Sequence, residues 1–390
     1  LLALVGNDER IIAAYREAVL EALDWAEKNA AETRMVEKGK IVTQATGNLA
    51  IGLFQHDTNR NQEPNLHFHA VIANVTQGKD GKWRTLKNDR LWQLNTTLNS
   101  IAMARFRVAV EKLGYEPGPT LKHGNFEARG ITREQVMAFS SRRQEVLDAR
   151  RGSGLEAGRI AALDTRASKD GIEDREALGM QWSDTAKSIG LDLAPLVERA
   201  QTRSLKQSIE TGRFGSLVER GRAWLGRFAA HVRGDPADPL VPKSVLRQDR
   251  ETIAAAQAVA SAVRHLSQRE AAFERTALYK AALDFGLPAT IADIEKRTRA
   301  LVRSGELIAG MGEHKGWLAS RDEVLTEQRI VSEVAAGKGA SSSAVEPGSA
   351  TDRVQTAAMA GQGFCLNEGQ LGAAKLILTS EDRTIAVQGI

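Results

Sequence analysis

The sequence predicts an α+β protein, in which an antiparallel sheet with flanking helices is followed by a mainly helical region. Three observations indicate this class. Residues 8–30 place apolar side chains at helical spacing. Residues 41–86 contain runs of β-branched residues separated by a polar loop and a glycine turn. Residues 131–230 and 250–305 then return to helical patterns.

The strand-like runs occupy four short segments. The polar loop at 57–65 and the turn at 77–81 are too short for crossover connections, so neighbouring strands should pair antiparallel. We expect these strands at 41–46, 49–56, 66–76 and 82–86.

A second helix is expected at 88–113, because its apolar pattern ends at Gly114 and Pro117 follows. The segment 123–130 favours one more short strand. Three helices are then expected before a hairpin around Gly312 to Gly316, which is a winged-helix-like arrangement. These helices are predicted at 250–268, 273–285 and 290–305.

Two segments read as linkers, because one is rich in proline and the other in small polar residues. They are 234–242 (GDPADPLVP) and 337–350 (GKGASSSAVEPGSA). After them the pattern predicts a helix at 365–378 and a buried strand at 384–387.

Composition excludes several classes of protein. The 390 residues are 42% hydrophobic and 26% charged with a net charge of +4, which is typical of a globular chain. Cys365 is the single cysteine, so disulfide scaffolds are excluded and the cytoplasm is the expected compartment. With no histidine near it in sequence, Cys365 is also rejected as a nucleophile. No apolar run is long enough for a membrane span. The start, LLALVGNDER, is interpreted as the interior of a longer protein.

Three of the seven histidines fall within fourteen residues. His67 and His69 are two apart on a predicted strand, so their side chains share one face. His56 ends the preceding strand across the loop, so pairing of the two strands would bring the three imidazoles together. Three histidine ligands with open coordination positions are typical of a catalytic metal ion. A chance cluster of histidines and an unrelated three-His metallohydrolase are the alternatives.

Basic residues surround this hairpin. Residues 40–130 hold 12 Lys and Arg against 7 Asp and Glu, and such cations can neutralise backbone phosphates. A solvated basic face without a ligand is the alternative. The candidate DNA-binding residues are Arg60, Lys82, Arg84 and Lys87.

The segment 47–89 resembles the metal-site signature of conjugative relaxases of the MobF class, which are bifunctional relaxase–helicases. The matching positions include His56-Asp57-Thr58, Arg60, Gln62-Glu63-Pro64, Leu66-His67-Phe68-His69, Ala73-Asn74-Val75-Thr76 and Leu86-Lys87-Asn88-Asp89. The resemblance extends from residue 1 to about 230.

The resemblance implies an HUH-type, palm-like fold and strand transfer on single-stranded DNA at a plasmid transfer origin. A tyrosine near the family's N-terminus attacks the scissile phosphate, leaving a 5′-phosphotyrosyl link and a free 3′-OH. His56, His67 and His69 would hold a divalent ion (Mg, Mn or Zn) that polarises the phosphate. Relaxosome accessory proteins are possible partners.

The resemblance also implies a domain order. It comprises a relaxase domain lacking its N-terminal part, a linker, a winged-helix-like accessory domain, a second linker and the start of a RecA-like helicase domain. The respective boundaries are 1–230, 231–247, 248–335, 336–350 and 351–390.

Two functional parts of the family do not carry over. Tyr15, Tyr115 and Tyr279 are the only tyrosines, and none has the context of the nucleophile, so the chain alone should not nick DNA. Gln370 and Gly389 match adenine-reading and phosphate-loop positions, but no Lys-Ser/Thr follows, so Mg-ATP is expected only in a full-length parent. A non-enzymatic DNA- and metal-binding remnant is the alternative from another class.

Overall fold

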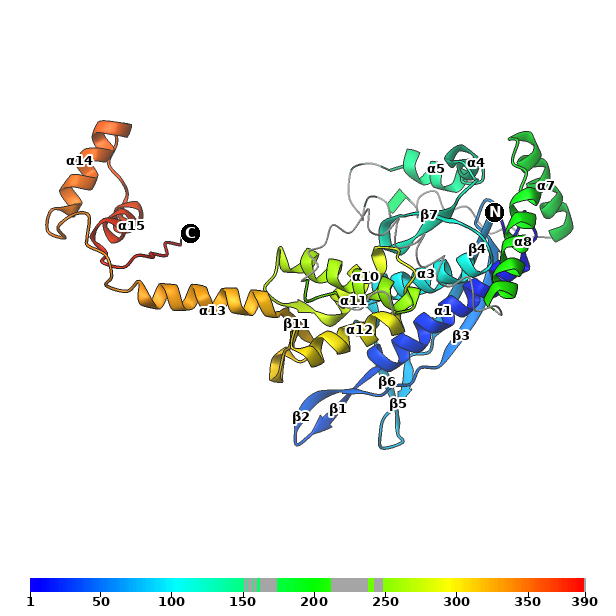
Figure 1. The fold of residues 1–390 in the computed structure, drawn as a ribbon, viewed down its shortest axis with the longest axis horizontal. Coiled ribbons are helices and arrows are strands. Elements are labelled where there is room, and N and C mark those ends of the chain that lie inside the picture. The colour runs from blue at the N-terminus through cyan, green and yellow to red at the C-terminus, as the bar shows by residue number, and fades with distance from the viewer. Residues whose placement is uncertain are drawn as a thin grey trace.

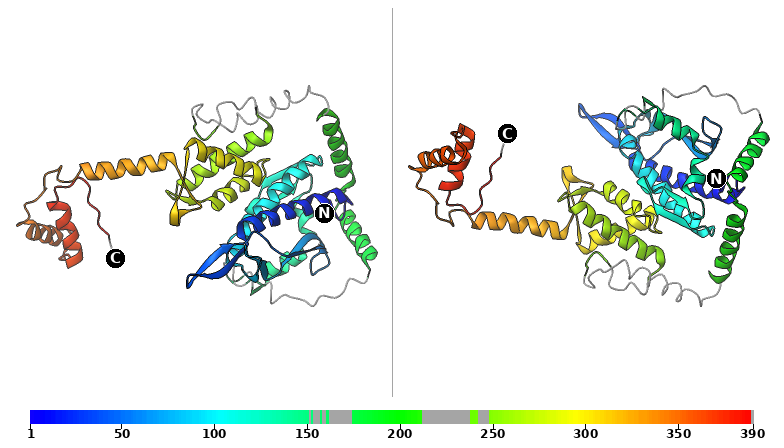
Figure 2. Two further views of the ribbon diagram at one scale, coloured as in Figure 1. Left: turned by 90° about the horizontal axis from the view of Figure 1, so that it is seen from below. Right: turned by 90° about the horizontal axis from the view of Figure 1, so that it is seen from above.

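The computed structural model describes residues 1–150, 174–211 and 248–388, and in addition residues 152, 157, 160, 161 and 238–241. Most elements form one body. A single helix, α13 (Arg321–Ala336), connects this body to α14 (Ala350–Gln362) and α15 (Glu368–Thr379) at the far end of the molecule (Figures 1 and 2). The mixture of helices and antiparallel strands confirms the predicted α+β class.

Residues 32–87 form two antiparallel sheets beside the long helix α1 (Glu9–Ala30). One sheet has the strand order β2-β1-β6-β5, and the other is the hairpin β3-β4. The strands are β1 (Glu32–Glu37), β2 (Lys40–Ala45), β3 (Ile51–Thr58), β4 (Pro64–Ile72), β5 (Val75–Gln77) and β6 (Trp83–Lys87).

The prediction of one strand at 66–76 is wrong, because β4 and β5 belong to different sheets. The backbone changes partners at Ala73–Asn74: the Ala73 N–H donates to the Ala50 carbonyl, whereas the Asn74 carbonyl accepts from Leu86. β1 was not predicted at all. The other three predicted strands correspond to β2, β3 and β6.

The prediction of one helix at 88–113 also needs correction. The chain forms α2 (Asp89–Gln93) and α3 (Asn95–Lys112), which meet at Leu94. Leu94 leaves helical geometry with φ −93° and ψ 2°, and its side chain is buried. The hydrogen bonds from Leu94 to Arg90 and from Leu98 to Leu94 continue through the break. The break between the two helices therefore leaves the Leu94 side chain buried while the backbone hydrogen bonds on both sides of it are kept.

A short hairpin and four helices follow. The predicted strand at 123–130 is present as β8, and the described part of 131–230 is helical as predicted; residues 212–230 lie outside the described residues. The elements are β7 (Pro117–Thr120), η1 (Lys122–Gly124), β8 (Phe126–Ala128), α4 (Arg133–Met137), α5 (Ser141–Asp148), α7 (Arg175–Ser188) and α8 (Ala194–Thr211).

The three helices and the hairpin predicted beyond residue 248 are confirmed, and β9 adds a third strand to the hairpin in the order β10-β11-β9. The elements are α10 (Arg250–Ser267), β9 (Phe273–Glu274), α11 (Arg275–Asp284), α12 (Ile291–Ser304), β10 (Leu307–Ala309), η3 (Gly312–His314) and β11 (Trp317–Ser320).

One hydrophobic core joins these C-terminal helices to the N-terminal half. A single cluster of buried side chains includes Trp25 of α1, Ile101 of α3, Val259 of α10, Leu278 of α11 and Ile294 of α12. Figure 2 shows the yellow helices lying beside the cyan α3. Segments predicted to lie in separate domains therefore share apolar packing. The predicted boundary at 231–247 lies largely outside the described residues and stays a prediction.

The helix predicted at 365–378 is confirmed as α15, but the strand predicted at 384–387 is wrong. The described residues 380–388 form no strand, and Val387 is half-exposed. A strand requires a hydrogen-bonding neighbour, and no sheet of the described residues reaches this segment. Gly389 lies outside the described residues.

Candidate metal centre

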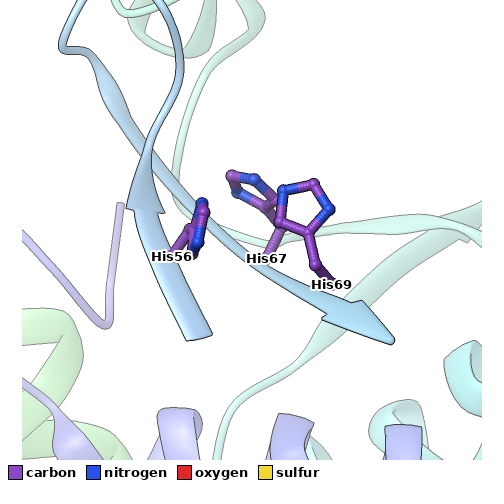
Figure 3. A group of neighbouring side chains, drawn as sticks. All are labelled: His56, His67 and His69. Atoms are coloured by element: carbon purple, nitrogen blue, oxygen red, sulfur yellow. The ribbon is translucent and has the colours of Figure 1, made fainter. Parts of the chain in front are cut away.

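The three histidines predicted to cluster do so on the β3-β4 hairpin. His56 of β3 stands directly opposite His67 of β4, and His69 lies two residues further along the same face. The ring centroids are 5.4 Å (His56–His67), 4.6 Å (His56–His69) and 4.9 Å (His67–His69) apart. Figure 3 shows the rings gathered above the two strands. The geometric prediction is confirmed.

The donor set fits a divalent metal ion. One ring nitrogen from each histidine lies within 4.8 Å of those of the other two. His67 Nδ1 lies 2.8 Å from the Asn65 carbonyl oxygen, which can only accept a proton, so Nδ1 carries the hydrogen. This fixes the tautomer that leaves the Nε2 lone pair available to a metal. Imidazole nitrogen suits borderline ions such as Zn²⁺ and Cu²⁺.

The loop that connects the two histidine strands is held by helices distant in sequence. Glu63 accepts hydrogen bonds from the Ser141 backbone N–H at 2.6 Å, at the start of α5, and from Asn59 Nδ2 at 2.5 Å. Burial alone would raise the pKa of Glu63, but these hydrogen bonds outweigh it and lower the pKa. Trp182 of α7 donates its Nε1–H to the Gln62 carbonyl at 2.8 Å. The hairpin tip is thereby fixed on two sides.

The opposite face of β4 packs onto the helices. The ring centroids of Phe68 and Tyr15 of α1 lie 5.5 Å apart, and those of Tyr15 and Phe106 of α3 lie 4.9 Å apart. Since neighbouring residues on a strand point to opposite faces, Phe68 anchors the strand while His67 and His69 face away from α1. The sheet therefore presents the three imidazoles on the side away from the core.

The three tyrosines are engaged elsewhere. Tyr15 lies among the aromatic rings behind β4, and its burial raises its pKa. The buried Tyr115 hydroxyl donates to Asp8 Oδ2 at 2.6 Å; burial first and this bond second raise its pKa. Tyr279 is buried in the core shared with α10–α12, where burial raises its pKa to about 12. No tyrosine of the chain is an exposed phenol on the histidine face.

The four candidate DNA-binding cations are not gathered at the histidines. Arg60 alone shares their hairpin, in the loop after β3. Lys82 lies in the turn before β6. On β6, Arg84 pairs with Asp80 at 2.6 Å and lowers its pKa, and Lys87 pairs with Glu32 at 3.5 Å. Arg84 and Lys87 are thus already partnered by carboxylates, and the DNA-binding role of all four residues stays a prediction.

Gln370 occupies a capping position. Its side-chain oxygen accepts from the Asn367 N–H at 3.2 Å, while the Gln370 N–H donates to Asn367 Oδ1 at 2.9 Å. This reciprocal pair is a capping box that begins α15. The predicted contact with adenine is not tested by this arrangement, and its companion Gly389 is outside the described residues.

The sequence model of the TrwC relaxase family matches residues 1–189. A solved structure of the conjugative relaxase TrwC in complex with oriT DNA, metal-free, is 39% identical over 49% of this chain and 70% of that chain, with a TM-score of 0.47. The chain belongs to the TrwC relaxase family. The sequence identity over most of the solved relaxase carries this assignment, and it confirms the resemblance to conjugative relaxases.

Other relatives agree with the family. A copper-bound structure of the TrwC relaxase with oriT DNA is 39% identical, covering 49% of this chain and 67% of that chain, with a TM-score of 0.47. The multifunctional conjugation protein TraI of Escherichia coli K12 is 38% identical over 222 residues, which is 54% of this chain and 12% of TraI. This TrwC-family chain therefore spans about 12% of the length of its curated relative.

Proposed function

We propose that this chain supplies the three-His metal site of a conjugative relaxase that nicks and rejoins single-stranded DNA at a plasmid transfer origin. The observation that carries the proposal is the convergence of His56, His67 and His69 on the outward face of a clamped hairpin. A bound divalent ion would stabilise the negative charge that develops on the phosphate oxygens during strand transfer. His67, with its tautomer fixed by Asn65, would hold the ion in one orientation.

The experiment that tests this proposal is metal analysis of the purified chain. After incubation with Zn²⁺ and removal of free ion, we expect about one equivalent per chain in the wild type and a near-complete loss in His67→Ala. His265→Ala, an exposed histidine on α10, is the matched control and should retain the ion. Equal metal content in wild type and His67→Ala would refute the site. Repeating the titration with Mg²⁺ and Mn²⁺ identifies the preferred ion.

We further propose that these 390 residues, taken alone, form no tyrosyl–DNA adduct. The support is the placement of all three tyrosines, each buried or half-buried and with a raised pKa that disfavours the phenolate. Incubation with a labelled transfer-origin oligonucleotide and metal should give no covalent band in a denaturing gel. A robust adduct, lost in one Tyr→Phe variant, would contradict this expectation. The non-enzymatic alternative, metal and DNA binding without nicking, would show as a band shift in a native gel with no covalent band in the denaturing gel.

The finer domain assignments are also proposals. The three helices and three-stranded sheet of 250–320 support a winged-helix-like accessory role. The match to 12% of a multifunctional conjugation protein supports a longer parent. A helicase that uses Mg-ATP and relaxosome partners are proposed from the resemblance to MobF-class relaxases alone. We propose a cytoplasmic location because the single cysteine, Cys365, is an exposed free thiol. No helix among the described residues is long and apolar enough to cross a bilayer.

A further inference from the structure

A second candidate site lies in a groove between the N-terminal helices and the helices α11 and α12. The groove has a volume of about 1000 Å³, at the upper end of the range of ligand sites. Its walls come from α1, α2 and α3 on one side and from α11 and α12 on the other, which lie together in Figures 1 and 2. Trp25 Nε1 of α1 donates a hydrogen bond to Glu295 Oε1 of α12 at 2.9 Å, which connects the two walls.

Positive charge exceeds negative charge along these walls. Three carboxylates line the groove, and each is already paired with a cation of the groove: Glu21 with Arg105 at 2.9 Å, Asp24 with Lys28 at 2.6 Å and Glu295 with Arg299 at 3.4 Å. The remaining lining cations are Arg90, Arg275 and Arg303. The walls therefore present a surplus of guanidinium groups that carboxylates of the groove do not neutralise.

Arg275 and Arg303 are the two cations available to a ligand. Both are exposed, and neither forms an ion pair with any residue that the structure describes. Arg90 is less available, because it lies 3.6 Å from Glu274. A guanidinium group offers a planar fork of donors that matches a phosphate oxygen pair.

Tyr279 adds a polar group to the same groove. Its side chain lines the groove and is only 5% exposed, yet its hydroxyl has no hydrogen-bond partner among the described residues. The hydroxyl is not among the fully buried polar atoms that lack a partner, so it reaches the solvent of the groove. The hydroxyl stays protonated at neutral pH and can donate to an anionic oxygen. A solvent-accessible hydroxyl in the same groove as two arginines that form no ion pair with the described residues fits an anionic ligand.

We propose that this groove binds the phosphate backbone of a single DNA strand, with Arg275, Arg303 and the Tyr279 hydroxyl contacting phosphate oxygens. The choice of DNA as partner rests on the proposed function; the anionic character of the ligand rests on the groove alone. A positively charged groove that follows the backbone is the usual way in which proteins hold single strands without reading sequence. The site is built on different elements from the histidine hairpin.

The test is the salt dependence of DNA affinity. Fluorescence anisotropy with labelled oligothymidylate measures binding by the full 390-residue chain, in EDTA so that metal does not contribute. Each phosphate contact to a single strand contributes a slope of about 0.7 in log K against log salt. Arg275→Gln/Arg303→Gln should therefore reduce the slope by about 1.4 and weaken binding roughly ten- to a hundredfold at 50 mM salt. Tyr279→Phe should weaken binding without changing the slope.

The matched control is Arg329→Gln/Arg353→Gln, which removes the same charge from exposed positions on α13 and α14. If both double variants show the same affinity and slope, the groove proposal is overturned. It is also overturned if the groove variant loses binding to poly-L-glutamate but not to oligothymidylate, which would identify an acidic peptide as partner. Metal content of the groove variant should equal wild type, so the failure of one site is distinguishable from the failure of the other.

Discussion

Replacement of Ile101 by alanine is expected to lower the free energy of unfolding by about 2–5 kcal/mol. Ile101 of α3 is fully buried and belongs to the cluster that contains Leu278 of α11 and Ile294 of α12. Removing its side chain leaves a cavity bordered by helices on both sides, which can close only in part. Because α3 and α11 pack directly, the loss should weaken both halves of the body together.

Hydrogen exchange measures this coupling without assuming that unfolding is two-state. In Ile101→Ala we expect the amides of α11 to lose protection in step with those of α3, although the two helices lie more than 160 positions apart in sequence. Val331→Ala, at a 67% exposed position on α13, is the control and should change stability by less than about 0.5 kcal/mol. Undiminished protection of α11 in Ile101→Ala would show that residues 250–320 form an independently folding domain.

This shared core marks the limit of what helical periodicity could predict. The apolar patterns of 250–268 and 290–305 correctly predicted helices with a buried face. Periodicity shows that a face is buried but not which element covers it. The proline-rich segment at 234–242 therefore suggested a boundary, whereas the helices after it pack against α1 and α3.

Strand prediction failed where local composition and tertiary pairing disagree. β1 reads ETRMVE, which is too charged for a strand signal, yet it pairs with β2 on one side and β6 on the other, with Thr33 buried. Residues 66–76 look like one continuous strand, yet the chain changes sheets at Ala73–Asn74. The residues of a strand do not by themselves determine which other strand they pair with.

The metal centre was predictable because its geometry is local. Two-residue periodicity places His67 and His69 on one face, and a short hairpin places His56 opposite them. The contacts that clamp the hairpin were not predictable, since Glu63 caps α5 78 positions later and Trp182 binds Gln62 across 120 positions.

Replacement of Asp8 by alanine is the second change expected to have a large effect. Asp8 is 3% exposed, and its carboxylate accepts from the Arg10 backbone N–H at 3.2 Å and from the Tyr115 hydroxyl at 2.6 Å. Loss of the helix N-cap costs about 0.5–2 kcal/mol. Leaving the buried Tyr115 hydroxyl without its acceptor costs about 1–3 kcal/mol more. The free energy of unfolding should therefore fall by several kcal/mol at neutral pH.

The same carboxylate should give the chain an acid-labile contribution to stability. The hydrogen bond from the Arg10 side chain lowers the pKa of Asp8, outweighing the opposing effect of burial. A carboxyl whose pKa is lower in the folded state stabilises fully above its unfolded pKa of about 3.9, and this stabilisation is lost as pH falls through the folded value. The difference in free energy of unfolding between pH 7 and pH 3, measured by urea unfolding, should thus be smaller in Asp8→Ala than in wild type.

The control is Glu9→Ala, which removes an exposed acid from the first turn of the same helix and should lower the free energy of unfolding by only about 0.3–1 kcal/mol. A wild-type acid dependence preserved in Asp8→Ala would assign the effect to other carboxylates.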